Sequence, residues 1–223
     1  LREKVKPGVT TLELDQIAER TAEKRGARPA FKGYRGYPYA LCASVNEEVV
    51  HGMPSKRVLL EGDIIGLDFG VYYQGFYGDS AITLPVGRVN AGAARLMEVT
   101  EKSLYEAIRQ TSAGNRLGDI SAAVQTTVEA AGFSVVRDFV GHGIGRQMHE
   151  DPQIPNFGKK GRGIELKAGM IFAIEPMVNE GDYRVKILAD GWTVVTEDGS
   201  LSAHFEHSVA ITDNGPEILS RLS

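Results

Sequence analysis

The sequence has only one cysteine and no long apolar run. Cys42 by itself excludes an intrachain disulfide and is typical of a reducing cytosol, so we expect a cytoplasmic protein. No apolar stretch approaches the roughly 20 residues that a membrane span needs, and we expect no membrane partner. The charged first residues lack the apolar core of a signal peptide, and an initiator Met is missing, so we expect the sequence to begin inside a longer chain.

Charge of one sign is not in large excess either. The chain carries 25 Lys and Arg against 29 Asp and Glu, for a net charge of −4. This balance predicts no nucleic-acid partner. With 223 residues, 42% of them hydrophobic, the chain is long enough for one well-filled core, arranged as one domain or as two half-domains.

Periodicity predicts three helices and several strands. We expect helices over Thr10–Lys24, Ala91–Gln110 and Leu117–Ala131, the first begun by a capping box of Thr10 and Glu13. Segments that alternate or are rich in β-branched and aromatic residues predict strands. These segments are 41–50, 63–72, 77–86, 170–178, 184–187, 192–196 and 205–212.

The chain also repeats itself weakly. Gly8, Leu14 and Gly26 recur as Gly114, Ile120 and Gly132, and Gly62, Asp68 and Val71 recur as Gly169, Glu175 and Val178. Coincidence among common residues is one explanation. An internal duplication is the other, and it places halves of about 1–112 and 113–223 around an approximate two-fold axis, with a site between them.

Five residues of metal-ligand type stand in short apolar or Gly-rich segments. They are Asp68, Asp79, His142, Glu175 and Glu206. Four carboxylates and an imidazole that face one point would repel each other unless cations lie between them. A pair of divalent metals on oxygen and nitrogen ligands is typical of a hydrolytic centre.

The spacing of Asp68 and Asp79 predicts a hairpin. A loop at Tyr73 and Gln74 places the two carboxylates directly opposite each other, whereas a loop at Gln74 and Gly75 makes them diagonal neighbours. Both registers put the carboxylates on one face of the sheet. The alternative for each Asp is that it only caps a turn.

The remaining candidates have weaker local signals. Glu175 interrupts an apolar strand before Pro176, and Glu206 alone would pass for a solvent-facing strand residue. His142 lies among three glycines, which indicates a backbone that bends tightly. His51 and His149 have no ligand spacing, so substrate contact fits them better than metal binding, and a hydrogen-bonded loop histidine is the alternative.

Taken together, the motifs resemble type I methionine aminopeptidases. The segments that carry the resemblance are Ser44–Gly52, Gly141–Arg146, His149–Pro152, Ile174–Val178 and Asp190–Val194. The resemblance extends from about Val5 to the C-terminus. It implies an α+β pita-bread fold, a single metallopeptidase domain over 1–223 in which two related halves form an antiparallel-rich curved sheet with helices outside. Only 25 residues separate His149 from Glu175, which leaves no room for the insertion of type II enzymes.

The resemblance also implies roles. Asp68 would bind one metal, His142 and Glu175 the other, and Asp79 and Glu206 would bridge both. The two divalent ions, Co, Mn, Fe or Zn, would activate a water whose proton Glu175 takes, while His51 and His149 contact the substrate. The activity implied is removal of N-terminal methionine from peptides and nascent chains, with preference for a small second residue. The ribosome is a candidate partner, and we expect a monomer.

A pocket for the methionine side chain is expected from soft and aromatic residues, with ordinary core packing as the alternative. Its predicted lining is Phe31, Tyr34, Tyr37, Cys42, Met148 and Trp192. Family members often have Cys at the position of Phe31 and Phe at that of Met148, which bears on pocket shape. Two other functions are kept open. One is an X-Pro peptidase of the same fold, and the other is a binding protein that has lost catalysis.

Overall fold

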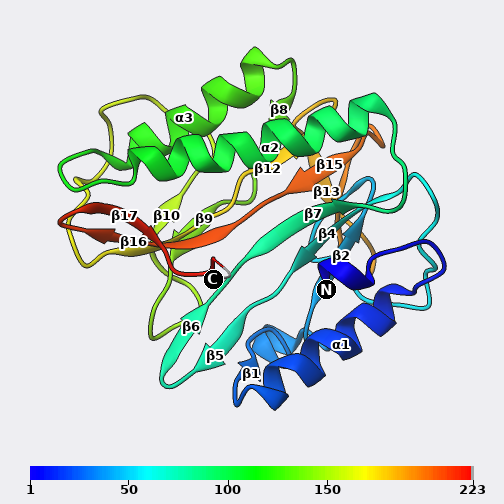
Figure 1. Ribbon diagram of the computed structural model, residues 1–223. Helices are drawn as coiled ribbons and strands as arrows, with labels where there is room; N and C mark the ends of the chain where they lie inside the picture. The colour runs from blue at the N-terminus through cyan, green and yellow to red at the C-terminus, as the bar shows by residue number, and fades with distance from the viewer. Residues whose placement is uncertain (222–223) are drawn as a thin grey trace.

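The computed structural model describes residues 1–221 and contains three α-helices, two 3₁₀ turns and short strands (Figure 1). The helices are α1 (Thr11–Lys24), α2 (Ala91–Gln110) and α3 (Leu117–Ala130), and the 3₁₀ turns are η1 (Arg2–Lys4) and η2 (Tyr34–Gly36). The strands of the first half are β1 (Arg28–Pro29), β2 (Cys42–Val45), β3 (Glu48–Val50), β4 (Ile64–Asp68), β5 (Val71–Tyr73), β6 (Phe76–Gly78) and β7 (Ala81–Pro85). Those of the second half are β8 (Ser134–Val135), β9 (Gly141–Gly143), β10 (Glu150–Ile154), β11 (Ile171–Ile174), β12 (Met177–Asn179), β13 (Val185–Ile187), β14 (Val194–Thr196), β15 (Ser202–His204), β16 (His207–Thr212) and β17 (Gly215–Ile218).

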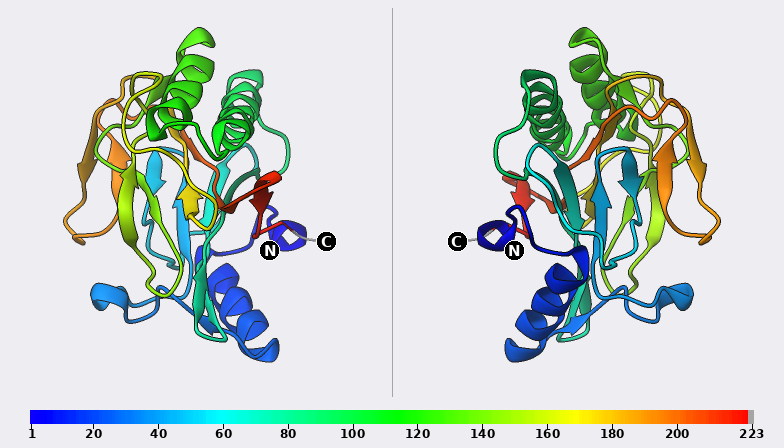
Figure 2. Two further views of the ribbon diagram at one scale, coloured as in Figure 1. Left: turned by 90° about the vertical axis from the view of Figure 1, so that its left-hand side faces the viewer. Right: turned by 90° about the vertical axis from the view of Figure 1, so that its right-hand side faces the viewer.

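The three predicted helices are confirmed to within one residue at each end. The capping box at α1 is present: the Thr10 hydroxyl accepts from the Glu13 N–H, and the Glu13 carboxylate accepts from the Thr10 N–H. Each helix buries its apolar face, and Figure 1 and Figure 2 show α2 and α3 side by side on one side of the molecule, with α1 on the opposite side.

The predicted strands are present but shorter, because several of them break where a site residue occurs. The segment 63–72 divides into β4 and β5 just after Asp68, and 170–178 divides into β11 and β12 at Glu175 and Pro176. Six short strands were not predicted from periodicity: β1, β8, β9, β10, β15 and β17. They are two to five residues long or rich in Gly and polar residues, so alternation could not identify them.

All strand pairs in the described residues are antiparallel, in agreement with the expected α+β class. The sheets run β1-β5-β6, β2-β4-β7, β13-β14-β3, β15-β12-β8 and β10-β9-β11-β16-β17. Reciprocal bonds between the backbones of Ala81 and Glu206 join the first half to the second at the middle of the molecule.

Four glycines of the weak sequence repeat make matched backbone hydrogen bonds. Gly8 donates to Leu59 and Gly114 donates to Leu166. Further along, Gly62 donates to the Val86 carbonyl, and the Val86 N–H donates to the carbonyl of Asp63. In the same way, Gly169 donates to the Ile211 carbonyl, and the Ile211 N–H donates to the carbonyl of Met170. All four glycines have positive φ, between 88° and 96°, which explains why glycine recurs at them.

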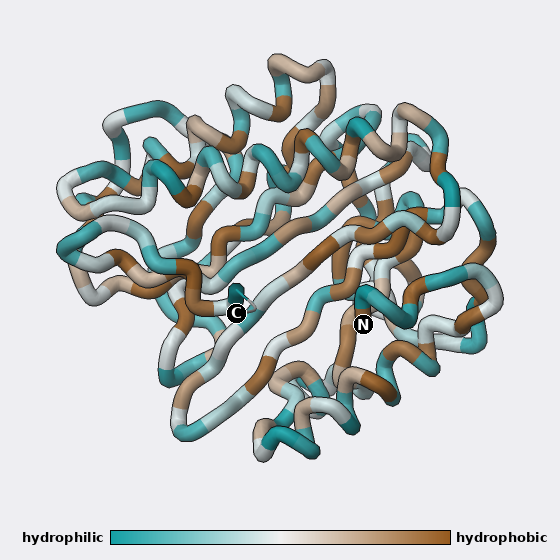
Figure 3. Tube along the Cα trace, in the orientation of Figure 1, coloured by the Kyte–Doolittle hydropathy of each residue, from teal (hydrophilic) through white to brown (hydrophobic). Residues whose placement is uncertain are grey.

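The core lies between the strands and the helices. The largest cluster packs α2 and α3 against strands of both halves, including Leu96, Ile120 and Phe172, and a second packs Leu14 of α1 against β2, β4 and β7. Figure 3 shows the more hydrophobic segments along the central strands and hydrophilic ones in the outer turns. Within residues 1–221, none of the helices combines the length and apolarity of a membrane span.

Candidate metal centre

The register between β4 and β7 decides how two of the carboxylates meet. Tyr73 pairs with Phe76, so the loop consists of Gln74 and Gly75, both with positive φ, and Asp68 pairs with Ala81. Asp68 and Asp79 are therefore diagonal neighbours, the second of the two registers that the sequence allowed. Both side chains line one pocket.

The other acids reach this pocket from the second half of the chain. Glu175 directly follows β11. Its backbone carbonyl accepts a hydrogen bond of 3.0 Å from the side-chain amide of Asn156, which holds the backbone in place. Glu206 stands between β15 and β16 and is only 2% exposed. Asp79 is clamped from the same side, because its N–H donates to the Ser208 hydroxyl at 2.9 Å and that hydroxyl donates back to the Asp79 carbonyl.

His142 lies on β9 with its tautomer fixed. Its Nδ1 is 2.8 Å from the carbonyl oxygen of Gly143, and because a carbonyl only accepts, Nδ1 must carry the hydrogen. The lone pair is then on Nε2, which lies 3.7 Å from Glu175 Oε1. A neutral imidazole with one nitrogen held by a backbone carbonyl is the form that binds a metal.

The flanking glycines allow the strands to approach. A Cβ on Gly141 would lie 2.4 Å from the Ala173 carbonyl oxygen, and one on Gly143 would lie 2.4 Å from the Asp151 carbonyl oxygen. Larger residues at these positions would push β9 away from β11 and β10, which it pairs with. The Gly-His-Gly sequence is thus a consequence of close backbone packing around a ligand-type side chain.

Burial and crowding perturb every acid of the group. Burial raises the pKa of Asp79 to about 7, and burial together with the nearby Asp79 raises the pKa of Asp68, Glu175 and Glu206 well above their ordinary values. Burial also lowers the pKa of His142. Without a cation, each of these carboxyls would be harder to ionise than an ordinary Asp or Glu.

The donor set fits a hard or borderline divalent ion. One ligand atom each of Asp79, His142 and Glu206 lies within 4.8 Å of the others, and Asp68 and Glu175 line the same pocket. Among residues 1–221, the buried atoms Asp68 Oδ1 and Glu206 Oε1 have no hydrogen-bond partner. Buried carboxylate oxygens without partners are costly, and a cation would satisfy them.

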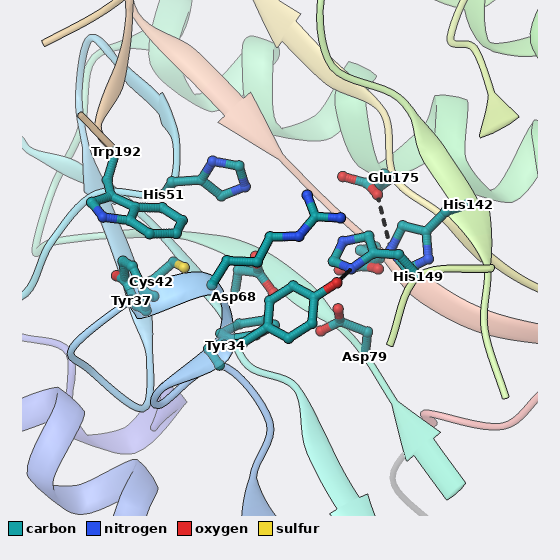
Figure 4. Close-up of a pocket in the computed structure, with 13 residues that line it drawn as sticks. Tyr34, Tyr37, Cys42, His51, Asp68, Asp79, His142, His149, Glu175 and Trp192 are labelled. Carbon is teal, nitrogen blue, oxygen red and sulfur yellow. Dashed lines mark hydrogen bonds and ion pairs between the residues drawn. The ribbon is translucent and has the colours of Figure 1, made fainter. Parts of the chain in front are cut away.

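Two more histidines and most of the predicted aromatic residues surround the acids (Figure 4). His149 lies against His142, with ring centroids 4.2 Å apart, and burial and His142 lower its pKa to about 4. His51 has φ of +58°, an unusual backbone conformation that often marks functional positions. Burial lowers the pKa of His51, so both rings are neutral near pH 7.

The predicted pocket residues divide into two groups. Those that line the cavity are Phe31, Tyr34, Tyr37, Cys42 and Trp192. Met148 is not among the lining residues, and it packs behind the wall with Phe31, Tyr37 and Cys42. Cys42 pairs directly with Asp68 across β2 and β4, which places the soft part of the pocket next to the acids.

Two residues of the site were missed from the sequence. Arg35 lines the pocket, and His204 is buried with Nε2 3.6 Å from Glu175 Oε2. Within the described chain, His204 Nε2 has no hydrogen-bond partner, and burial lowers its pKa to about 3. His204 lies at the end of β15, two residues before Glu206, and that spacing in extended backbone could have indicated that both face one side. Arg35 lies in a loop and gave no signal.

Comparison with known proteins agrees with this geometry. Residues 1–213 match the model of metallopeptidase family M24. A methionine aminopeptidase of Clostridium perfringens is 58% identical over 98% of this chain and 88% of its own length, and methionine aminopeptidase 1 of Bacillus subtilis is 55% identical over 100% and 90%. The crystal structure of methionine aminopeptidase from Thermotoga maritima, 53% identical, covers 99% of this chain and 89% of its own, with a TM-score of 0.98.

Proposed function

This chain belongs to metallopeptidase family M24, and from that premise we propose that it removes the N-terminal methionine from peptides and proteins, with a small residue preferred in second place. The proposal covers a single pita-bread domain over 1–223, with halves of about 1–112 and 113–223. Its main support is the meeting of four carboxylates and His142 beside an aromatic and sulfur-lined cavity.

The metal ligands in this proposal are Asp68, Asp79, His142, Glu175 and Glu206, holding two divalent ions of Co, Mn, Fe or Zn. Asp79 and Glu206, which each place a ligand atom within 4.8 Å of the other and of one in His142, are proposed as the shared pair. When bound, such ions lower the pKa of a water and polarise a carbonyl. Their charge would also offset the burial that raises the pKa of all four carboxyls, and the repulsion by Asp79 that adds to it in Asp68, Glu175 and Glu206.

Glu175 is proposed as the residue that moves protons. Its side chain is 14% exposed, so it can meet both water and substrate. Once ionised, it would accept a proton from the attacking water and later deliver it to the leaving amine. Asn156 holds its backbone, and His142 and His204 lie on either oxygen, so the carboxylate is confined in orientation.

His149 and His51 are proposed to contact the substrate. Both are neutral near pH 7, so each can donate one hydrogen bond without carrying charge. A single donor to the developing oxyanion generally contributes about 10²–10³ in rate. The free amine of the substrate would lie near Asp68, which limits cleavage to the first residue.

The composition of the cavity wall supports the proposed preference for methionine. Cys42, Tyr37 and Trp192 form a soft and aromatic wall, with Met148 behind it, and the Tyr37 and Trp192 rings meet edge to face at 5.1 Å. Such a wall suits an unbranched thioether side chain. Because Cys42 pairs with Asp68, a methionine held there keeps its own amine beside the acids.

An activity assay tests the proposal. The purified protein with Co²⁺, Mn²⁺ or Fe²⁺ should release Met from a Met-Gly peptide and should stop when a chelator is added. Asp79→Ala should abolish turnover, whereas Glu98→Gln, an exposed acid on α2, should leave it unchanged. Wild-type turnover in Asp79→Ala would refute the two-metal site, and faster cleavage before proline than after methionine would favour an X-Pro peptidase.

Monomeric state, ribosome association and cytoplasmic location stay predictions. Light scattering after size exclusion measures the oligomeric state. Co-sedimentation tests ribosome association, and cell fractionation tests the location. The alternative of a catalytically inactive binding protein would require a chain that binds no metal, which elemental analysis tests.

A further inference from the structure

One hydrogen bond at the pocket joins residues 115 positions apart in the sequence. The hydroxyl of Tyr34 lies 2.8 Å from Nδ1 of His149, and the two rings stack with centroids 5.3 Å apart and an interplanar angle of 21° (Figure 4). His149 in turn lies against His142. Tyr34 is thus the outer member of a row of three rings that ends at a proposed metal ligand.

The loop around Tyr34 holds this ring in place. Gly33 donates to the Tyr37 carbonyl at 2.7 Å, and the N–H of Tyr37 donates to Tyr34 at 2.9 Å. Arg35 has φ of +50°, a conformation that L residues rarely adopt, and its guanidinium lies 5.4 Å from the Tyr34 ring centroid. The Arg35 guanidinium and the His149 ring thus both lie against the Tyr34 ring, and the backbone hydrogen bonds of this turn hold its position.

The direction of the hydrogen bond follows from the chemistry of the two groups. If Nδ1 of His149 donated, the phenol hydroxyl of Tyr34, a better donor than acceptor, would have to accept, and its own hydrogen would turn to solvent because this bond is exposed. A lone pair would then stand on Nε2 in a pocket lined by four carboxyls. If Tyr34 donates, both difficulties disappear, because Nδ1 accepts and Nε2 carries the hydrogen.

We propose that Tyr34 is a positioning residue whose hydroxyl donates to Nδ1 of His149 and fixes the tautomer in which Nε2 carries the hydrogen. The adjacent His142 has the opposite tautomer, because its Nδ1 donates to the Gly143 carbonyl. Two neighbouring imidazoles are thus given different tasks by their outer partners. His142 offers a lone pair to an ion, and His149 offers an N–H to a substrate carbonyl. The role of His149 toward a substrate rests on the proposed function.

Nitrogen NMR of the metal-free protein tests the tautomer directly. With ¹⁵N-labelled histidine at pH 7.5, long-range proton–nitrogen spectra distinguish a protonated ring nitrogen from one with a lone pair, and His149→Gln identifies the His149 signals among the five histidines. We expect protonated Nε2 and hydrogen-bonded Nδ1 in the wild type. In Tyr34→Phe, which keeps the stacked ring, the Nδ1 resonance should move toward that of a free lone pair and the single tautomer should become a mixture.

Tyr73→Phe is the matched control. It removes a hydroxyl from a half-exposed tyrosine on the β5-β6 hairpin and should leave the His149 signals unchanged. A wild-type spectrum with protonated Nδ1 would overturn the proposal, as would Tyr34→Phe with unshifted His149 resonances. The wild-type spectrum decides the tautomer even if a variant folds poorly.

Kinetics distinguish failure of this proposal from failure of the peptidase function. Tyr34→Phe should lower kcat by about tenfold with KM for a Met-Gly peptide nearly unchanged, because ring packing is kept while the oriented donor is lost. Its content of bound Mn²⁺ should equal that of the wild type, since Tyr34 is not a ligand. If the wild type cleaves no peptide but shows the expected spectrum, the proposed function fails and the role of Tyr34 in fixing His149 stands.

Discussion

Replacement of Asp79 by Asn should change how the stability of the metal-free protein depends on pH. Burial raises the pKa of Asp79 in the folded protein to about 7, from an ordinary value of 3.8. Between these values the folded protein holds a proton that the unfolded chain has released. The resulting stabilisation is complete below the unfolded pKa and is lost as pH rises through the folded pKa, so the free energy of unfolding falls over this range.

The magnitude follows from the two pKa values. Each unit of pH inside the window changes the free energy of unfolding by ~1.4 kcal/mol, and partial ionisation near pH 7 reduces the sum. From pH 5 to pH 7 the wild type should therefore lose about 2 kcal/mol relative to Asp79→Asn, whose side chain cannot titrate. Part of this difference belongs to the Asp68 carboxyl, which lies close enough to share the proton.

Buried histidines act in the opposite direction. Burial lowers the pKa of His149 to about 4 and that of His204 to about 3, whereas the same histidines have a pKa of 6.5 in the unfolded chain. Between the folded and unfolded values, the unfolded chain binds more protons than the folded protein. The free energy of unfolding from these two histidines therefore rises with pH until about pH 6.5. Because both variants contain these histidines, the comparison of wild type with Asp79→Asn cancels them.

Urea unfolding in a chelator at pH 5, 6 and 7 measures the difference. A constant gap between the two proteins would refute the assignment of Asp79 as a protonated buried acid. Added Mn²⁺ should stabilise the wild type more at pH 8 than at pH 5, because the ligands must be ionised to bind it. Equal stabilisation at both pH values would show that the acids do not hold the ion.

Three further changes test separate parts of the site. His149→Ala should lower turnover by about 10² while leaving metal content intact, and loss of metal in elemental analysis would show that it is a ligand. Gly143→Ala should lower the free energy of unfolding by about 1–3 kcal/mol, since its Cβ would lie 2.4 Å from a backbone oxygen; an unchanged Tm would contradict this. Asp15→Ala should lower the free energy of unfolding in urea by about 2 kcal/mol, because two buried loop N–H groups lose the carboxylate that accepts from them at 2.8 and 3.0 Å. Wild-type stability in this variant would show that water replaces the carboxylate.

Local features of the sequence were enough for the helices and for the identity of the acids. The capping box at Thr10 and the glycines that end α1 and α3 act within a few residues, so they could be identified without tertiary information. An acid inside an apolar strand is also a local signal, because burying it without a partner is unfavourable. Short strands such as β9 and β15 had no comparable pattern and were missed.

The register at the two aspartates shows where local reasoning stopped. Two loops were compatible with the sequence, and the chain uses the one in which Gln74 and Gly75 both have positive φ, as two-residue hairpins prefer. That choice makes Asp68 and Asp79 diagonal, and Ser208 from the other half then clamps Asp79.

By itself the sequence determined which residue types were present, where the helices begin and end, and which family motifs occur in order. Only the tertiary structure decided that Met148 lies behind the cavity wall, that His204 faces Glu175, and that Tyr34 reaches His149. The physical reason is distance along the chain. Capping and periodicity act over one or two turns, whereas the pairs that orient the site are separated by up to 129 residues and meet only when the two halves pack together.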